Sequence, residues 1–508
     1  MDVLTSSGFA HTLQTVAFAT IIFAACVLLP KINYRTQLAK LPAYGSPASE
    51  KQRQAYLKSA AKMYREGYEK FKDTVYRMAS VDGEDNIVIP PRFLPEVRRL
   101  PDSVLSFPKA IEKTMEVKYT NILTDEPIVA HSIKADLTPA LARLNSVVYT
   151  EVEQALKEEI PECKDWTPVP IYSRLVNMVA KISGRVFVGP ELCRDDGYLD
   201  AAVNYTMDLI NAQRAIKKIR PLYRPYLAPR LPEIKRLLQR QKSAEAFLRP
   251  VVQARRDAEK NDPSYQKPDD LLSWFMNRSE DFGVESTEKL AKLQLGIIFA
   301  AIHTTTLTAT NILYTMAVDP EAIEPLREEI RTVMAENGGT ITTRALQYMV
   351  KLDSYMKECV RFYPAGLTSF TRKVLKGFTL SNGQYIPKGV VIEVPSHAIY
   401  QDDMNYPNGD TFDGFRHYKL RQGGTATDHA RNQFVTTNEQ NLMFGYGRHA
   451  CPGRFFAANE IKMLLARILL DYDVKNEDGS MERYPNILMG RSTSPDPRKK
   501  LLFKRVEV

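Results

Sequence analysis

The stretch FGYGRHACPGRFFA, Phe444 to Ala457, decides the fold of this 508-residue chain. Gly445 and Gly447 have no Cβ, so the loop can adopt positive φ angles and pass close to a flat group. Cys451 is followed by Pro and Gly, where a helix can begin with unpaired N–H groups directed back toward the sulfur. A positive helix end lowers the pKa of a thiol. The pattern therefore predicts a thiolate held in a fixed position.

The residues after this loop predict the helix that keeps it rigid. Apolar residues recur there at helical spacing, at Phe455, Ile461, Leu464, Leu465, Ile468 and Leu469. The alternative is that Cys451 is only a small buried hydrophobe, as most free cysteines are. Two glycines, an aromatic residue, a basic residue and Pro-Gly at fixed offsets favour a ligand instead. This geometry suits an axial ligand of heme iron.

The segment resembles the cysteine-ligand loop of the cytochromes P-450, whose pattern is Phe, two residues, Gly, one residue, Arg or His, one residue, Cys, one residue, Gly. Phe444, Gly447, His449, Cys451 and Gly453 fill every defined position. The resemblance covers essentially the whole chain. It implies one large, mainly α domain with a minor β part, and a heme that activates dioxygen. Thiolate ligation pushes electron density onto iron and favours O–O cleavage.

The same resemblance assigns roles to the residues of the loop. It implies heme b as the cofactor, with Cys451 as its axial thiolate ligand. His449 would lie near a heme propionate, and the Phe444 ring would shield the sulfur. Gly445 and Gly453 would belong to the cofactor-binding loop through their shape.

A second segment agrees with the first. Glu358 and Arg361 lie three residues apart in a predicted helix that ends before Pro364, so they can pair, although most such pairs are solvated and contribute little. They resemble the family's Glu-x-x-Arg pair, which a charge from a downstream loop completes. That loop would be 412–416, with Arg416 as the third charge, although Gly414 stands where a proline is usual. The resemblance gives these three residues a structural role.

Between these segments, Asn382-Gly383 and Pro387-Lys388-Gly389 break runs rich in β-forming residues, and Asn-Gly predicts a hairpin turn. In the family this region forms the small sheet beside the heme. Arg372 stands where a propionate-binding residue is usual, and a cation facing a carboxylate suits a partly dry site. The alternative is a solvated arginine on a strand.

A further segment, Leu295 to Met316, is apolar almost throughout and predicts a buried helix. Ala300 and Ala301 leave room beside a flat ligand. Thr304 stands where the family keeps the hydroxyl that delivers protons. A hydroxyl inside an apolar helix also bonds back to its own backbone, which is the alternative for Thr304.

His303 replaces the acid of the family pattern, and Ala301 replaces its glycine. A histidine can relay protons because its ordinary pKa lies near neutrality, and it can equally pack in the core and donate to a carbonyl. We predict His303 and Thr304 as catalytic candidates. The variant FAAIHTTT resembles the fungal branch related to ent-kaurene oxidases and to indole-diterpene and meroterpenoid oxygenases, as does ISGRVFVGPELC at 182–193.

The N-terminus predicts a membrane anchor over residues 1–30, because no charged side chain occurs from Val3 to Pro30 and the stretch is long enough to span. Lys31, Arg35 and Lys40 follow it, which places the body on the cytosolic side. A cleaved signal peptide would carry basic residues before the apolar run, and here none do. We predict a single-pass protein of the endoplasmic reticulum membrane, with a hinge at 31–47 and one heme-binding domain at 48–508.

Five scattered cysteines argue against a disulfide framework, and the formal charge of +9 forms no block dense enough for nucleic acid. The resemblance implies that electrons come from NADPH through a membrane-bound NADPH-cytochrome P-450 reductase, with cytochrome b5 as a second donor. A basic face can steer such an acidic partner. Solubility and attraction to anionic membrane lipid explain the charge equally well.

Substrate recognition is implied by family position alone, at 105–107, 205–222, 366–369, Leu488 and Met489, beside Ala301 and Thr305. These residues are mostly apolar or small, which fits a small apolar substrate held by shape. We predict a monooxygenase that oxidises a fungal secondary metabolite, a terpenoid such as a diterpene, indole-diterpene or meroterpenoid. The alternatives are a heme-thiolate isomerase or dehydratase, an oxidase of a polyketide-derived metabolite, and a non-catalytic membrane protein.

Overall fold

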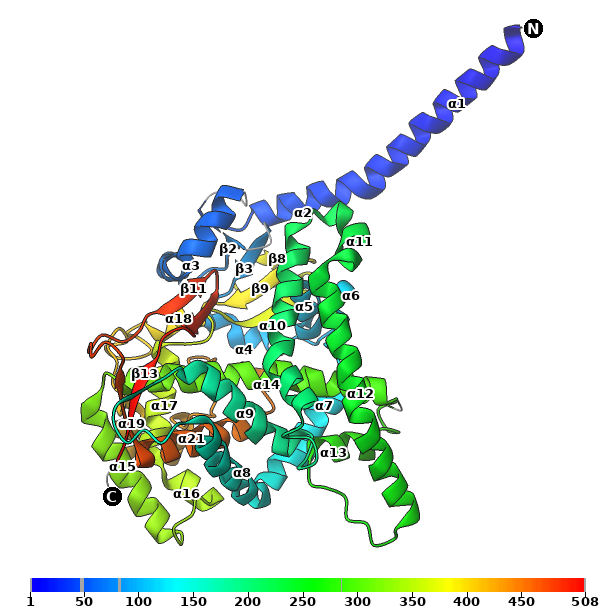
Figure 1. The fold of residues 1–508 in the computed structure, drawn as a ribbon. Coiled ribbons are helices and arrows are strands. Elements are labelled where there is room, and N and C mark those ends of the chain that lie inside the picture. The colour runs from blue at the N-terminus through cyan, green and yellow to red at the C-terminus, as the bar shows by residue number, and fades with distance from the viewer. Residues whose placement is uncertain (1, 46–49, 81–83, 285, 507–508) are drawn as a thin grey trace.

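The computed structural model describes residues 2–45, 50–80, 84–284 and 286–506. One long helix projects from a body in which helices surround a smaller β region (Figure 1). The body is mainly α with a minor β part, as the sequence predicts. Its helices are α1 (Asp2–Phe23), α2 (Leu29–Ala39), α3 (Glu50–Lys70), α4 (Leu94–Val97), α5 (Phe107–Met115), α6 (Val117–Thr120), α7 (Pro127–Ser132), α8 (Thr138–Glu159), α9 (Ile171–Phe187), α10 (Asp196–Lys218), α11 (Arg224–Leu227), α12 (Pro232–Asn261), α13 (Leu271–Asn277), α14 (Thr287–Met316), α15 (Pro320–Glu336), α16 (Thr343–Tyr348), α17 (Val350–Phe362), α18 (Ser396–Tyr400), α19 (Arg416–Gln422), α20 (Ala426–Arg431) and α21 (Arg454–Asp471).

The strands form one larger sheet and three small ones. They are β1 (Ala43–Tyr44), β2 (Tyr76–Ala79), β3 (Asp85–Val88), β4 (Leu105–Ser106), β5 (Thr167–Val169), β6 (Ser369–Val374), β7 (Phe378–Thr379), β8 (Tyr385–Ile386), β9 (Val391–Val394), β10 (Tyr472–Asn476), β11 (Asn486–Met489), β12 (Ser492–Pro495) and β13 (Leu501–Arg505). The larger sheet has the order β1-β2-β3-β9-β6-β4, so strands from the first 110 residues meet strands from 369–394 in it. A β10-β13-β5 sheet and the hairpins β11-β12 and β7-β8 complete the β part.

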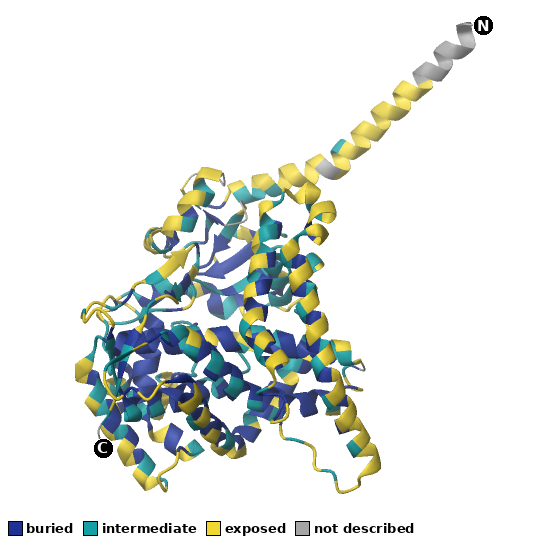
Figure 2. Ribbon diagram, viewed as in Figure 1, coloured by how far each residue is buried: buried dark blue, intermediate teal, exposed yellow. Residues whose placement is uncertain are grey.

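Helix α14 runs through the centre of the helical body. It begins after Ser286, whose side chain accepts a hydrogen bond from the Lys289 N–H, an N-cap that satisfies a donor without an intrahelical partner. The helix packs against α9, α10, α12, α17 and α21. Because it is apolar on nearly all sides, a central position that buries most of its surface is favourable. Figure 2 shows the buried residues gathered in these central helices.

The N-terminal region departs from the expected hinge at 31–47. Two helices are long and apolar enough to cross a membrane by length and composition, His11–Ala39 and the mostly buried Thr287–Met316; the first has none of its apolar window buried. The first part of the expected hinge is helical, because α2 continues to Ala39. Pro30 lies in the first turn of α2, where its missing N–H is tolerated, and a π-helical turn at Ala24–Leu28 precedes it. Positions 46 and 47 lie outside the described residues.

Helix α21 carries an acid that the apolar pattern of this helix does not predict. Glu460 is 1% exposed. Its Oε1 accepts a hydrogen bond from the Ser183 hydroxyl at 2.8 Å, while Oε2 has no partner among the described residues. Burial raises the pKa of Glu460 to about 8, with Ser183 acting in the opposite direction. The carboxyl group is therefore largely protonated in the folded protein at neutral pH.

We predict that Glu460→Gln stabilises the folded protein, and that its advantage grows with pH. The folded state holds a proton that the unfolded state loses above the ordinary pKa of 4.5, so parent stability falls from there to about pH 8. Above that window the variant should be more stable by on the order of 5 kcal/mol, since the pKa of Glu460 rises from 4.5 to about 8 and one pKa unit is about 1.4 kcal/mol. Thermal unfolding across this range checks it, with the exposed Glu482→Gln as control. Parallel pH profiles of parent and Glu460→Gln would contradict the prediction.

Candidate active site

The loop before α21 has the backbone that its glycines predict. Gly445 and Gly447 have φ of +74° and +73°, values that residues with a Cβ rarely adopt. The Cys451 N–H donates to the Phe444 carbonyl oxygen at 2.7 Å, which closes the loop on itself. Gly453, with φ of −84°, is the residue before the helix that begins at Arg454. The sulfur is thereby fixed at the N-terminus of a buried helix.

The pKa of the Cys451 thiol is raised, opposite to the sequence expectation. Burial raises it, while the N–H groups of Gly453 and Arg454 and the charge of the Arg454 guanidinium lower it. The helix terminus therefore acts as expected, but loss of water outweighs it. A thiol of this kind becomes a thiolate when a metal replaces its proton.

The Phe444 side chain lies partly buried against the main core. Its ring packs edge-on against Phe434, with 5.4 Å between the centroids. The side chain of Phe444 is thus held by Phe434, and its backbone carbonyl by Cys451.

One face of α14 remains accessible although the rest of the helix is buried. Ala300 and Thr304 are exposed, and Ala301, Leu307 and Thr308 are partly exposed. These positions follow the i, i+4, i+8 spacing of a single helical face. The Thr304 hydroxyl donates to the Ala300 carbonyl oxygen at 2.7 Å, so its oxygen can still accept a hydrogen bond from a partner outside the helix.

His303 points away from that face. Its Nε2 lies 2.9 Å from the Val203 carbonyl oxygen on α10, and its Nδ1 lies 3.3 Å from the Tyr172 hydroxyl on α9. A carbonyl only accepts, so Nε2 carries the proton and Nδ1 accepts from the tyrosine. Burial lowers the pKa of His303, against the effect of Val203. This geometry favours the packing alternative over the proton relay.

Arg372 is a buried cation without an acidic partner. It is 5% exposed, and its Nη1 donates to the neighbouring Thr371 carbonyl oxygen at 2.8 Å. The guanidinium stacks on Phe107 and Phe370, at 5.1 and 4.2 Å from the ring centroids. No carboxylate of the described residues forms an ion pair with it. Burial lowers its pKa to about 10.

The Phe107 ring that packs against Arg372 also packs against His449, with 5.7 Å between the ring centroids. Its Nε2 lies 2.8 Å from an Asp102 carboxylate oxygen, and Arg448 is 3.7 Å from that oxygen. The loop thus presents two basic side chains on the side where Arg372 is buried. No motif pointed to Asp102, because its contact spans almost 350 residues of chain.

Glu358 is fully buried, and the two arginines that the sequence predicts as its partners lie beside it. Its Oε1 lies 2.7 Å from Arg361 Nη2 and 3.1 Å from Arg416 Nε. The Asp413 N–H also donates to Oε1, at 3.1 Å. Burial raises the pKa of Glu358, but the hydrogen bonds from Arg361 and the proximity of the His417 ring bring it down to about 2. No sequence motif predicted His417, whose Nε2 lies 3.6 Å from Glu358 Oε2.

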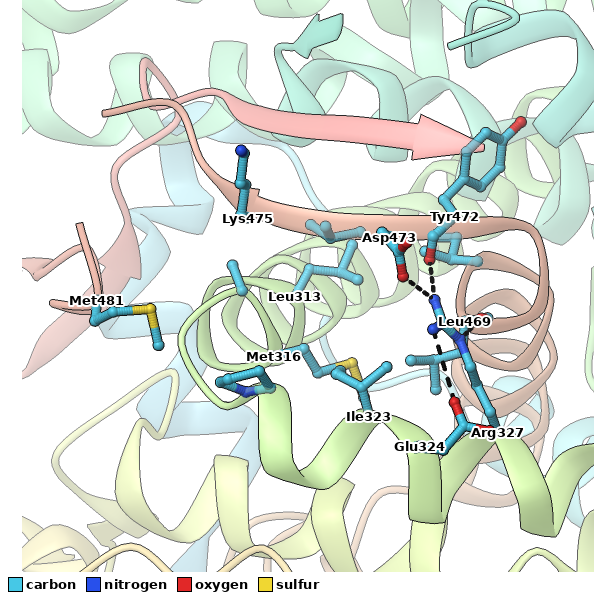
Figure 3. Close-up of a pocket in the computed structure, with 14 residues that line it drawn as sticks. Leu313, Met316, Ile323, Glu324, Arg327, Leu469, Tyr472, Asp473, Lys475 and Met481 are labelled. Atoms are coloured by element: carbon cyan, nitrogen blue, oxygen red, sulfur yellow. Dashed lines mark hydrogen bonds and ion pairs between the residues drawn. The ribbon is translucent and has the colours of Figure 1, made fainter. Parts of the chain in front are cut away.

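A surface hollow lies elsewhere in the molecule (Figure 3). It has a volume of about 330 Å³ and lies among α14, α15, α21 and β10. Arg327 at its base is satisfied by the Leu469 and Tyr472 carbonyl oxygens and by Asp473. Neither Cys451 nor Thr304 lines it, so this hollow is separate from the candidate site.

Comparison with known proteins identifies the class. A sequence profile described as "Cytochrome P450" matches residues 130–503. The chain therefore belongs to the cytochrome P-450 family, and it is a monooxygenase of that family.

Curated relatives match along nearly the whole chain. Cytochrome P450 monooxygenase TES1 of Alternaria alternata is 37% identical, covering 98% of this chain and 94% of its own. Cytochrome P450 monooxygenase ATR3 of Stachybotrys chlorohalonatus is 40% identical, covering 83% and 89%. Cytochrome P450 monooxygenase paxP of Penicillium paxilli is 36% identical, covering 95% and 94%. A solved structure, "Retinoic acid bound cyanobacterial CYP120A1", has a TM-score of 0.68 at 16% identity over 92% of this chain and 99% of that one, which shows the shared fold.

The side chains at the site fit the heme that this family implies. A thiol at a helix N-terminus supplies a soft ligand for iron. Among the described residues the buried Arg372 guanidinium has no carboxylate partner, and a heme carries carboxylates. The small residues Ala300 and Ala301 lie on or beside the accessible face of α14 and suit a flat group.

We predict that Arg372→Gln weakens heme retention. A hydrogen bond between a charged pair contributes roughly 1.5 to 3 kcal/mol, so heme transfer to apomyoglobin should become about tenfold faster or more. The heme-to-protein absorbance ratio after purification gives a second measure. Arg331→Gln, at an exposed ion pair on α15, serves as control. Equal transfer rates for parent and Arg372→Gln would show that Arg372 holds no carboxylate.

Proposed function

We propose that this chain is a membrane-anchored heme-thiolate monooxygenase that oxidises an apolar fungal secondary metabolite of the terpenoid class, with electrons from an NADPH-dependent reductase. The observation that carries the proposal is the Cys451 sulfur fixed at the N-terminus of α21 by the loop at 444–453. Heme bound there supplies the iron on which dioxygen is activated. Arg372 and His449 hold its carboxylates, and Gly445 and Gly447 let the backbone lie close to it.

Thr304 delivers protons at the accessible face of α14. Its hydroxyl hydrogen is directed to the Ala300 carbonyl, so its oxygen holds a water molecule that passes protons toward the reacting oxygen. His303 has both ring nitrogens occupied by Val203 and Tyr172. We therefore give it the role of fastening α14 to α9 and α10, in place of the relay.

Helix α1 anchors the protein in the endoplasmic reticulum membrane, with the body in the cytosol. Support comes from the exposure of its apolar residues, among them Leu13, Phe18 and Ile21, which are each more than half exposed. Lys31 and Arg35 follow in α2 and suit the cytosolic headgroups. The terpenoid class rests on the resemblance of FAAIHTTT and ISGRVFVGPELC to the kaurene-oxidase and indole-diterpene branch.

The test of this function is expression of the full chain with a P-450 reductase and a panel of terpenoid intermediates, followed by product analysis. Substrate-dependent NADPH consumption with an oxygenated product supports it. Product formation without any NADPH consumption would show an isomerase or dehydratase instead.

We predict that Cys451→Ala abolishes the thiolate signature in the carbon monoxide difference spectrum, because no other described group replaces the sulfur at the α21 terminus. Product formation should fall below detection. Cys193→Ala removes a buried free thiol elsewhere and should keep the spectrum. A thiolate spectrum in Cys451→Ala would refute the assigned ligand.

We predict that Thr304→Ala keeps heme but separates NADPH consumption from product formation. Loss of the proton-delivering hydroxyl should lower product per NADPH about tenfold or more, with reducing equivalents released as hydrogen peroxide. Thr308→Ala, one turn along α14, removes a hydroxyl that donates to the Thr304 carbonyl oxygen and should change coupling little. The same coupling in parent and Thr304→Ala would remove the assigned role.

A further inference from the structure

Arg491 lies at the turn of the β11–β12 hairpin and is held by a buried carboxylate. Its Nη1 is 2.7 Å from Glu393 Oε2. Glu393, on β9, is 0% exposed, and its Oε1 accepts a hydrogen bond from the Tyr64 hydroxyl at 2.6 Å. Because the carboxylate is fixed on both sides, it fixes the direction of the guanidinium.

The backbone around Arg491 is fixed as firmly as its side chain. The Gly490 N–H donates to the Leu57 carbonyl oxygen on α3 at 3.0 Å. Gly490 has φ of +59°, and a Cβ there would lie 2.9 Å from Tyr56 Cε1, so a larger residue is excluded. On the other side, the Leu367 N–H donates to the Arg491 carbonyl oxygen at 2.8 Å.

These contacts join Arg491 to the segment 366–369, which the resemblance assigns to the substrate pocket. Gly366 pairs with Ser492, the residue after Arg491. The Thr368 hydroxyl lies 3.4 Å from the Glu393 oxygen that holds Arg491. Glu393 therefore connects α3, the hairpin and the pocket segment in one network.

Two nitrogens of the guanidinium form no hydrogen bond with the described residues. Its described hydrogen bonds, to Glu393 and to the Thr371 hydroxyl at 3.4 Å, both leave from Nη1. For Nε and Nη2 the described residues provide no hydrogen bond. The side chain is 30% accessible, although its partner Glu393 is 0% accessible. Burial lowers the pKa of Arg491, but the Glu393 carboxylate outweighs burial and raises it, so the group stays a cation.

We propose that Arg491 is a specificity-determining residue that donates hydrogen bonds from Nε and Nη2 to an acceptor oxygen of the substrate. Preferred substrates are then apolar molecules that carry a carboxylate or carbonyl group. The planar fork of a guanidinium matches a carboxylate with two parallel hydrogen bonds, which a lysine cannot provide. Glu393 is the positioning residue, because its ion pair with Nη1 sets the orientation of the Arg491 guanidinium. This assignment rests on the proposed monooxygenase function and narrows its substrate class.

The test uses three probes that share one chain length: dodecanoic acid, methyl dodecanoate and dodecane. Their affinities for the purified heme-loaded full chain are measured from the substrate-induced change in the heme absorption spectrum. The parent should bind the acid most tightly and the hydrocarbon least. Arg491→Gln should weaken acid binding about tenfold or more, since it removes charged hydrogen bonds, and should leave dodecane binding unchanged.

Two variants complete the design. Arg498→Gln changes a nearby arginine whose side chain is 82% exposed and pairs with Asp496, and it should bind all probes like the parent. Arg491→Lys keeps the charge and should still lose acid affinity, which carries the test if Arg491→Gln fails to show the carbon monoxide spectrum of a folded protein. A parent that binds acid no more tightly than dodecane overturns the proposal, as does equal loss for acid and dodecane in Arg491→Lys. Reductase-dependent NADPH consumption tests the monooxygenase function separately, so either assignment can fail alone.

Discussion

The immobilisation of one thiol at the N-terminus of α21 is the constraint on which the rest of the site depends. The loop at 444–453 achieves it with two glycines at positive φ and a hydrogen bond from the Cys451 N–H to the Phe444 carbonyl. Helix α21 is buried and packs against α14, α15 and α8, so it cannot shift without disturbing the core. A ligand that moved would change the distance between sulfur and iron, and with it the electron density that the thiolate donates.

Burial has two opposite effects on this site. It raises the pKa of the Cys451 thiol and lowers that of Arg372, because both ionised forms lose water. Each charged form is therefore less favourable in the protein alone than in water, and a bound group with iron and carboxylates would favour both. Glu358 shows the contrasting case, since Arg361, Arg416 and His417 surround it and its pKa falls to about 2. The Glu358 carboxylate therefore finds its partners within the chain. The Arg372 guanidinium, by contrast, has no acidic partner among the described residues.

Thr304 and His303 are neighbours in the sequence, where both were catalytic candidates, but they lie on different faces of α14. Successive residues of a helix lie about 100° apart, so Thr304 and His303 cannot share one face. Thr304 lies on the accessible stripe with Ala300, whereas His303 reaches Val203 and Tyr172 on other helices. The choice between proton relay and packing depends on those partners, which are far away in the sequence. Arg491 is a similar case, since its partners Glu393 and Tyr64 come from β9 and α3.

The sequence by itself determined the features that depend on local order: the cysteine loop, the buried helix ending at Met316, the Glu358–Arg361 spacing, the apolar N-terminal run and the mainly α class. Local conformation and periodicity suffice for these, because glycine, proline and apolar spacing act within a few residues. It did not predict that α2 continues to Ala39 within the expected hinge, where one proline in the first turn does not end the helix. Only the tertiary structure decided which way His303 points, which acid is near His449, and that the Cys451 pKa rises. It also decided that Nε and Nη2 of Arg491 form no hydrogen bond with the described residues. Each of these depends on burial or on a partner about a hundred or more residues away, and no local pattern records such contacts.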